Sequence, residues 1–276
     1  GQTKISNEFG KLAASGQMNV QNAKVHGLDL GYTISADYDI TDDLPADLIT
    51  IRNTTIKLGT MPIVVSGTVN SKTSPAQIDL HVKSNNVSIS EAAKLAAASG
   101  VAFAPGTTIV GNLNANIQAQ GAADKPALSG TISGSDLQVS GKGIPQRVDV
   151  RSVNLAFTPS EIHSDNFNVT SGGTTVAAQF SVRQYLSKSP QVDATIRAPN
   201  AALAEVLLMA KAYGVTGLET INGTGTLGIN LHAAGTLQNP SVSGSISGRE
   251  VQISGKSMPQ PVSMKSINLA FTPTEI

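Results

Sequence analysis

The sequence predicts a mainly β protein made of repeated antiparallel sheet units, curved into a groove or a taco-like sandwich, with one short α-helix in each repeat. Apolar and polar residues alternate with a period of two over many short runs. Clusters of Gly, Pro, Asn and Ser separate these runs, as turns separate strands. One long segment also recurs along the chain. Because a period of two places neighbouring side chains on opposite faces of a sheet, each predicted strand has one apolar face.

The recurring segment has a period of 114 residues. Residues 129–162 and 243–276 align at this offset, with 21 of 34 positions identical. A weaker copy, an Ala-Ser-Gly motif, begins one period earlier. The repeat predicts a first β unit at 1–125, a second at 126–239 and a truncated start of a third at 240–276. We therefore expect this chain to be a piece of a longer protein.

Strands are predicted wherever the alternation is clear. In the first unit they are expected at 28–40, 47–58, 63–69, 78–82 and 109–119. In the second unit they are expected at 137–140, 148–157, 162–169, 176–182, 192–197 and 227–233.

Helical spacing occurs once in each complete unit. In the second unit, Leu203, Val206, Leu207 and Ala210 form an apolar stripe, and Asn200 is the expected N-cap. The equivalent helix of the first unit is expected at 90–99. A further short helix is predicted at 6–14.

Composition and short motifs argue against nucleic-acid binding, a membrane-spanning helix and enzyme activity. The formal net charge is 0, whereas nucleic-acid binders normally carry a basic footprint. The chain has no cysteine and no stretch of about 20 apolar residues that would span a bilayer. A G-x-G-x-x-G string at 223–228 opens a strand rather than a helix, so we interpret it as a turn. We predict no enzyme activity, catalytic residue, cofactor or metal site.

The titratable residues fit a solvated surface. His81 and His232 fall on the polar side of alternating strands. An acidic cluster at 37–47 could bind a cation, but a solvated strand edge and turn is the simpler interpretation.

The number of one-sided apolar strands exceeds what two short helices can cover. The sheet must therefore fold over itself as a sealed sandwich or leave a trough for an apolar ligand. Medium-sized aliphatic residues would suit acyl chains, for which each buried CH₂ contributes about 0.8 kcal/mol. The residues expected to line such a groove are Leu30, Tyr32, Ile34, Ile78, Leu80, Val82, Leu113, Ile117, Val192, Ile196, Leu227, Ile229 and Leu231.

Several stretches resemble the AsmA family of bacterial envelope proteins. They are ADLITIRNTTIKLG at 46–59, LAFTPSEI at 155–162, SDNFNVTSGGTT at 164–175 and MAKAYGVTG at 209–217. The resemblance covers nearly the whole chain and is carried by the order and spacing of structural motifs, and it supplies no catalytic residue.

The resemblance implies a periplasmic, β-rich segment of a protein of Gram-negative bacteria, anchored in the inner membrane through a segment that this chain lacks. It further implies a role in outer-membrane biogenesis, with phospholipid acyl chains as partners along a hydrophobic groove, as in bridge-like lipid-transfer proteins. The alternative is a structural or assembly factor that affects the insertion of outer-membrane proteins without conducting lipid. The sequence leaves both open.

Overall fold

The computed structural model describes residues 1–22, 24–25, 28–29, 33–90, 107–141, 144–212, 216–256 and 258–272. In this part of the chain, α2 (Leu203–Ala212) is the longest α-helix, residues 89–90 are also helical, and a 3₁₀ turn, η1 (Leu44–Ala46), joins two strands. Sixteen strands form an antiparallel sheet, and two more form a separate pair. The mainly β prediction is confirmed, whereas the curvature of the sheet into a groove stays a prediction.

The strands of the large sheet are β1 (Gln2–Glu8), β2 (Lys11–Val20), β5 (Ile34–Asp43), β6 (Leu48–Leu58), β7 (Met61–Asn70), β8 (Gln77–Ser88), β9 (Thr107–Ala122), β10 (Ala127–Gly141), β11 (Ile144–Phe157), β12 (Glu161–Ser164), β13 (Phe167–Ser171), β14 (Thr174–Arg183), β15 (Gln191–Ala202), β16 (Asn222–Thr236), β17 (Asn239–Ser254) and β18 (Val262–Phe271). The separate pair is β3 (Lys24–Val25) with β4 (Leu28–Asp29).

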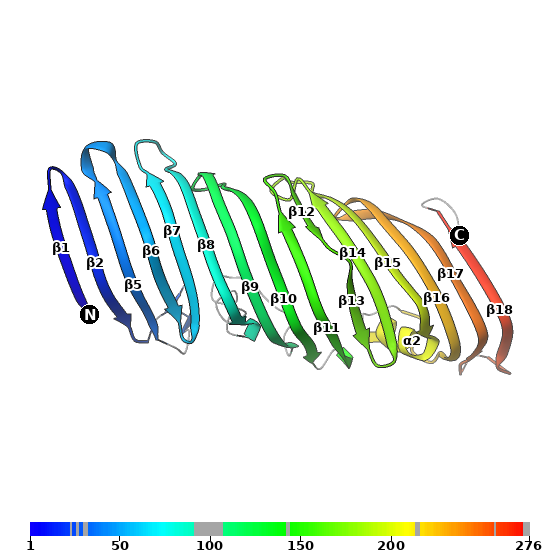
Figure 1. Cartoon of the computed structure of the whole chain (residues 1–276). Coiled ribbons are helices and arrows are strands. Elements are labelled where there is room, and N and C mark those ends of the chain that lie inside the picture. The colour runs from blue at the N-terminus through cyan, green and yellow to red at the C-terminus, as the bar shows by residue number, and fades with distance from the viewer. Residues whose placement is uncertain are drawn as a thin grey trace. The chain divides into compact units, whose positions relative to one another are not determined.

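Hydrogen-bonded neighbours in the large sheet follow chain order, as the colours of Figure 1 show. The exception is β13, which lies off this path and pairs with both β11 and β14. Short turns therefore connect most neighbours, and consecutive strands supply most of the pairing. This is the arrangement expected when alternating runs are separated only by turn residues.

The chain divides into two compact units. Unit 1 comprises Gly1–Phe103, Gly111–Gly134 and Ala156–Pro159, and unit 2 comprises Ala104–Val110, Ser135–Leu155 and Ser160–Ile276. Whether the sequence repeats at 1–125, 126–239 and 240–276 fold as domains stays a prediction.

Backbone irregularities recur with the period of the sequence. Asn22, Asp136 and Glu250 are spaced by 114 residues and have φ values of 53°, 51° and 48°. Positive φ is uncommon for residues other than glycine, so its recurrence shows that the copies share a backbone path and not merely a composition. Both copies of the strongest repeat form a strand pair, β10 with β11 and β17 with β18. The later strand of the pair is shorter in the second copy. Pro145 lies within β11, whereas the equivalent Pro259 precedes the first residue of β18.

Three local expectations are wrong. Residues 6–14 belong to β1 and β2, joined by a turn in which Phe9 and Gly10 have φ values of 51° and 80°. The expected strand at 162–169 is two strands, β12 and β13. Asn200 is not an N-cap, because β15 continues to Ala202 before α2 begins at Leu203. The expected helix at 90–99 lies outside the described residues, apart from Ser90.

A glycine at the centre of the repeat is required by close backbone approach. Gly244 has a φ of 144°, and a Cβ atom placed there would run into the carbonyl oxygen of Asn230 on the neighbouring strand. Gly130, one period earlier, has a φ of 125° and meets the carbonyl oxygen of Asn116 in the same way. Only glycine combines this conformation with this contact.

We predict that Gly244→Ala lowers the free energy of unfolding by about 3 kcal/mol, because it adds a steric clash to the strain of positive φ. Gly235→Ala is the matched control, since Gly235 has a φ of 125° but its nearest atoms are 3.7 Å from the added Cβ. Strain alone should cost the control about 1 kcal/mol. Urea unfolding measures both, and equal losses in the two variants would contradict the clash.

Candidate functional site

The sheet of unit 1 has a mostly aliphatic face, with Asp42 of β5 as a charged residue near one end of it. Leu80 pairs with Ala119 and Val82 pairs with Ile117 across β8 and β9. Directly opposed residues of an antiparallel pair lie on the same side of the sheet, so these four side chains share a face. The pairing continues through β7 and β6 to β5. The structure thereby places the predicted lining residues Ile34, Ile78, Leu80, Val82, Leu113 and Ile117 on one face.

The sheet of unit 2 has an equivalent face. Ile196 pairs with Leu231, and Ala198 pairs with Ile229, across β15 and β16. On the same register, Val192 opposes Gly235 and Ala201 opposes Leu227. All five lining residues predicted for this unit, Val192, Ile196, Leu227, Ile229 and Leu231, therefore lie on one face. Leu30 and Tyr32, the remaining two, lie outside the described residues.

β-bulges keep these faces aliphatic along strands that would otherwise lose their alternation. In β8 the register shifts between Ser84 and Val87, and in β15 it shifts between Ala198 and Ala201, one repeat period later. An extra residue in a strand restores the side-chain phase after a polar insertion. In β8 the amide nitrogen of Asn86 donates a 2.8 Å hydrogen bond to the Asn114 side-chain oxygen. Asn200, expected to cap the helix, lies in the bulge of β15.

Two small buried clusters occupy part of these faces. One cluster in unit 1 consists of Leu58, Met61 and Val87, against which Ile34 and Leu113 pack. The cluster in unit 2 contains Ala198, Ala201, Leu203, Leu227 and Val251, and Ile229 packs against it. Leu203 is the first residue of α2, which lies at one end of β15 and β16 in Figure 1. The lining residues Ile78, Leu80, Val82, Ile117, Val192, Ile196 and Leu231 belong to neither cluster.

The rest of each face is only partly covered. Nine apolar residues are buried in the described part of the chain, and Ile196 on the face of unit 2 keeps 40% of its surface exposed. Of the seven lining residues outside the clusters, Ile196 is exposed and the other six are half-buried, so none of them is sealed as in a dry interior.

The opposite side of each sheet is polar. His232 Nε2 lies 3.1 Å from the Asp193 carboxylate, and His81 Nε2 lies 3.9 Å from the Asp79 carboxylate. Both histidines are half exposed, as the alternation predicted. Two residues of the acidic cluster have basic partners: Arg52 lies 3.4 Å from Asp39, and Lys11 lies 3.3 Å from Asp43. The described residues contain no group of three metal-ligating side chains.

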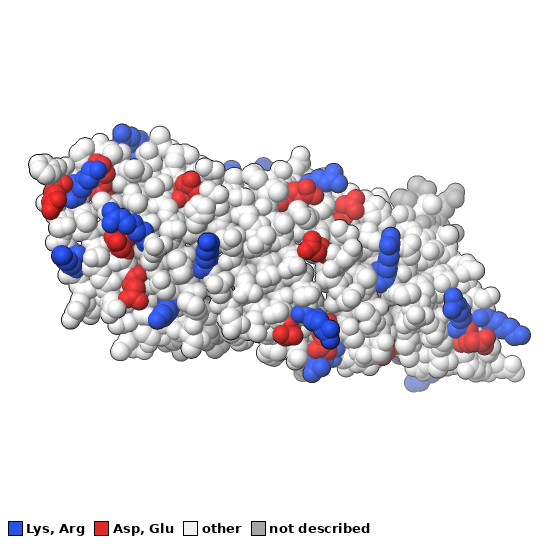
Figure 2. Space-filling model, viewed as in Figure 1, with Lys and Arg blue, Asp and Glu red and all other residues white. Residues whose placement is uncertain are grey.

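Charges of both signs are interspersed on the face seen in Figure 2. Large areas between them carry no charge. A single-sign patch of the kind that attracts a polyelectrolyte does not occur on this face.

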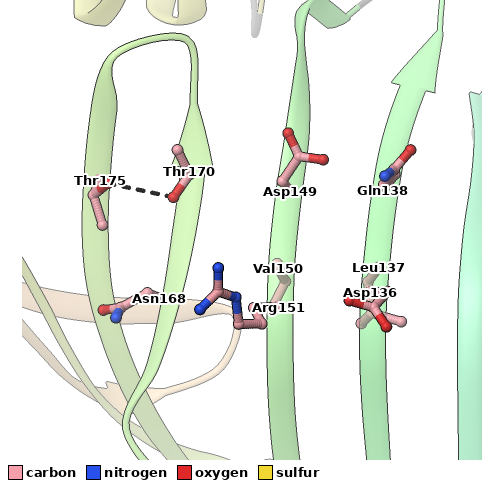
Figure 3. Close-up of a pocket in the computed structure, with 9 residues that line it drawn as sticks. All are labelled: Asp136, Leu137, Gln138, Asp149, Val150, Arg151, Asn168, Thr170 and Thr175. Carbon is pink, nitrogen blue, oxygen red and sulfur yellow. Dashed lines mark hydrogen bonds between the residues drawn. The ribbon is translucent and has the colours of Figure 1, made fainter.

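A polar hollow of about 360 Å³ lies between β10, β11, β13 and β14 in unit 2 (Figure 3). Its lining comprises Asp136, Leu137, Gln138, Asp149, Val150, Arg151, Asn168, Thr170 and Thr175. Arg147 holds Asp149 at 2.9 Å, and the Thr170 and Thr175 hydroxyls are 3.3 Å apart. Among the described residues, no histidine, serine or cysteine lines the hollow.

A second cavity, of about 320 Å³, lies beneath α2. Its walls are mostly aliphatic and are formed by Val148, Val169, Ser171, Thr174, Val176, Glu205, Val206 and Met209. Sequence reasoning missed this cavity, because its residues come from three strands and a helix. The period-two pattern identified the valines only as members of an apolar face.

Glu205 fastens α2 to the turn between β13 and β14. The amide nitrogen of Gly173 donates a 2.7 Å hydrogen bond to Glu205 Oε1, and the Thr174 hydroxyl donates to Oε2. Thr174 Oγ1 in turn accepts a 3.1 Å hydrogen bond from the amide nitrogen of Ala202. The Gly173 amide, followed by the Thr174 hydroxyl, holds the pKa of the Glu205 carboxyl below its ordinary value. Glu205 is therefore ionised at neutral pH.

Comparison with known proteins gave no match to a family model, a curated protein or a solved structure. Among the described residues, no helix is both long and apolar enough to cross a membrane.

We predict that the contribution of Glu205 to stability disappears in acid. Because folding lowers the pKa of this carboxyl, its stabilising effect is complete above the unfolded pKa, about 4.3, and is lost as the pH falls through the folded pKa. At pH 7, Glu205→Gln should cost about 1 kcal/mol, a modest value because the carboxylate is reachable by solvent.

The measurement is chemical unfolding of both proteins between neutral and acidic pH. The difference between wild type and Glu205→Gln should be constant above about pH 5 and shrink below it. A difference that stays constant into acid would contradict the anchoring role of the ionised carboxylate.

Proposed function

We propose that the aliphatic faces of the two units bind the acyl chains of phospholipids, and that the protein is a binding segment rather than an enzyme. The observation that carries this proposal is a mostly aliphatic face, kept in phase by bulges, that is only partly covered in the described residues of both units. Soluble monomers rarely expose contiguous apolar patches larger than a few hundred Å². Such a face therefore needs an apolar partner.

The composition of the face favours a flexible chain over a protein partner. Hot spots at protein interfaces are enriched in Trp, Tyr and Arg. The chain has no Trp, and the open lining residues in both units are Ile, Leu and Val. Branched aliphatic side chains offer a smooth surface without fixed hydrogen-bonding groups, which suits a hydrocarbon chain of variable conformation.

The free energy gained by burying part of an acyl chain is sufficient for binding. Burying eight methylene groups of one acyl chain would contribute about 6 kcal/mol before the cost of ordering the chain is subtracted. The resulting affinity per site is modest, which is the property that a lipid-conducting surface requires, because the lipid must also leave.

The resemblance to the AsmA family supports a cellular setting. On that basis we propose a periplasmic location, an inner-membrane anchor outside this chain and a role in supplying phospholipid during outer-membrane biogenesis. The polar opposite side, with its mixed charges, suits contact with an aqueous compartment.

The decisive experiment places a charge on the open part of the face. Leu113 and Ile229 are poor choices because they pack against the buried clusters. Ile117→Asp in unit 1 and Ile196→Asp in unit 2 lie outside those clusters. Asn116→Asp and Asn230→Asp are matched controls, because each adds the same charge to the polar side of the same or the neighbouring strand.

We predict that Ile117→Asp and Ile196→Asp reduce crosslinking to a phospholipid with a photoreactive acyl chain by about tenfold, since an ionised carboxylate against hydrocarbon costs several kcal/mol. Their melting temperatures should fall by only a few degrees, because an open face leaves the carboxylate hydrated in the free protein. The controls should crosslink like wild type.

Two outcomes would contradict lipid binding. One is the absence of crosslinking in the wild-type protein. The other is loss of folding in both face variants with the controls intact, which would mean that the faces are sealed and that the protein is a structural β array.

A further inference from the structure

The cavity beneath α2 has features that acyl-chain binding on the open faces does not explain. It lies in unit 2 between the helix and β11, β13 and β14, and its volume of about 320 Å³ is at the lower end for small-molecule sites. Five of its eight lining residues, Val148, Val169, Val176, Val206 and Met209, are apolar.

One polar atom in this cavity has no partner. The hydroxyl oxygen of Ser171 is buried and makes no hydrogen bond within the structure. Leaving a buried hydroxyl unpaired costs stability, so native proteins rarely retain one without a reason. A water molecule held there would need two to four polar partners, whereas most of the wall is aliphatic.

The polar groups next to Ser171 in the lining are Thr174 and Glu205. The Thr174 hydroxyl is already used, because it donates to Glu205 and accepts from the Ala202 amide. The Glu205 carboxylate accepts hydrogen bonds from the Gly173 amide and from Thr174, and a carboxylate has about four acceptor positions, so it can accept a further donor. Among the described residues, it is the only charged group that lines the cavity.

This combination selects the chemistry of a ligand. Aliphatic walls favour a hydrocarbon body, and the free hydroxyl and the carboxylate favour a head that donates hydrogen bonds. A carboxylate or phosphate head would be repelled by Glu205, and no Lys, Arg or His lines the cavity to offset the repulsion.

We propose that the cavity beneath α2 binds a single-chain aliphatic amphiphile with an uncharged or cationic, hydrogen-bond-donating head, its chain against the valines and Met209 and its head on Ser171 and Glu205. This site lies on the aliphatic face of unit 2 where α2 covers it, and its polar groups distinguish it from the open part of the face, so either proposal can fail while the other stands.

The test uses three probes with the same eight-carbon chain: octylamine, octanol and octanoate. Met209 is the reporter, because its methyl group lines the cavity and the chain has only five methionines. Spectra of the ¹³C-methyl-methionine protein, with Met209→Leu for assignment, follow binding at this site. Met264 packs against the unit 2 cluster and reports on the apolar face outside the cavity.

At pH 7 we expect octylamine and octanol to shift the Met209 signal, with octanoate binding at least tenfold more weakly than octylamine. Glu205→Gln should remove most of that difference. Ser171→Val should raise the melting temperature, because it removes an unpaired hydroxyl, and should weaken octanol and octylamine about tenfold. A Ser171→Val protein that is more stable but binds the probes more weakly would show that the hydroxyl belongs to a ligand site and is not a structural defect.

Several results would overturn the proposal. Octanoate binding as tightly as octylamine would refute the role of Glu205. Unchanged titrations in Ser171→Val would refute the role of the hydroxyl. A Met209 signal that no probe moves would mean that the cavity holds water only, and shifts confined to Met264 would assign the binding to the open face.

Discussion

The structure depends on one constraint: each long strand must keep its aliphatic side chains on a single side of the sheet over ten or more residues. Alternation alone does not achieve this, because a polar insertion moves every later side chain to the wrong face. The bulges between Ser84 and Val87 and between Ala198 and Ala201 restore the phase. They turn two imperfect sequence patterns into one uninterrupted aliphatic face in each unit, and the buried clusters, the cavity and the open lining all lie on these faces.

The same constraint explains why glycine recurs at the centre of the repeat. At Gly130 and Gly244 the neighbouring strand approaches so closely that a side chain would meet its carbonyl oxygen. A face lined by Leu, Ile and Val loses bulk at these points. The repeat thus preserves a backbone shape as well as a hydrophobic pattern, which is why φ values near 50° recur at Asn22, Asp136 and Glu250.

The helix has a different role from the strands. It contributes Leu203 to the cluster that contains Ala198 and Ala201, where small side chains allow close packing. Its attachment is polar and comes from a distant turn, through Glu205 to Gly173 and Thr174. A helix fixed at its first turn, with a cavity along its side, covers only part of the face. The position of the Glu205 contact therefore determines which part of the unit 2 face the helix covers and which part stays open.

The sequence by itself determined the mainly β fold, the period of 114 residues, the sidedness of the strands and the surface positions of His81 and His232. These follow from the covalent geometry of the chain, because consecutive side chains of a strand must point to opposite faces. It failed at residues 6–14, where Phe9 and Gly10 adopt positive φ and make a hairpin, and at Asn200, which is a bulge residue and not a cap. Only the tertiary structure decided that Glu205 meets a turn about 30 residues earlier and that the Ser171 hydroxyl is left unpaired in an aliphatic cavity. Such contacts depend on which strands become neighbours and on how closely the helix packs against the sheet. Neither property is encoded in the spacing of residues along the chain.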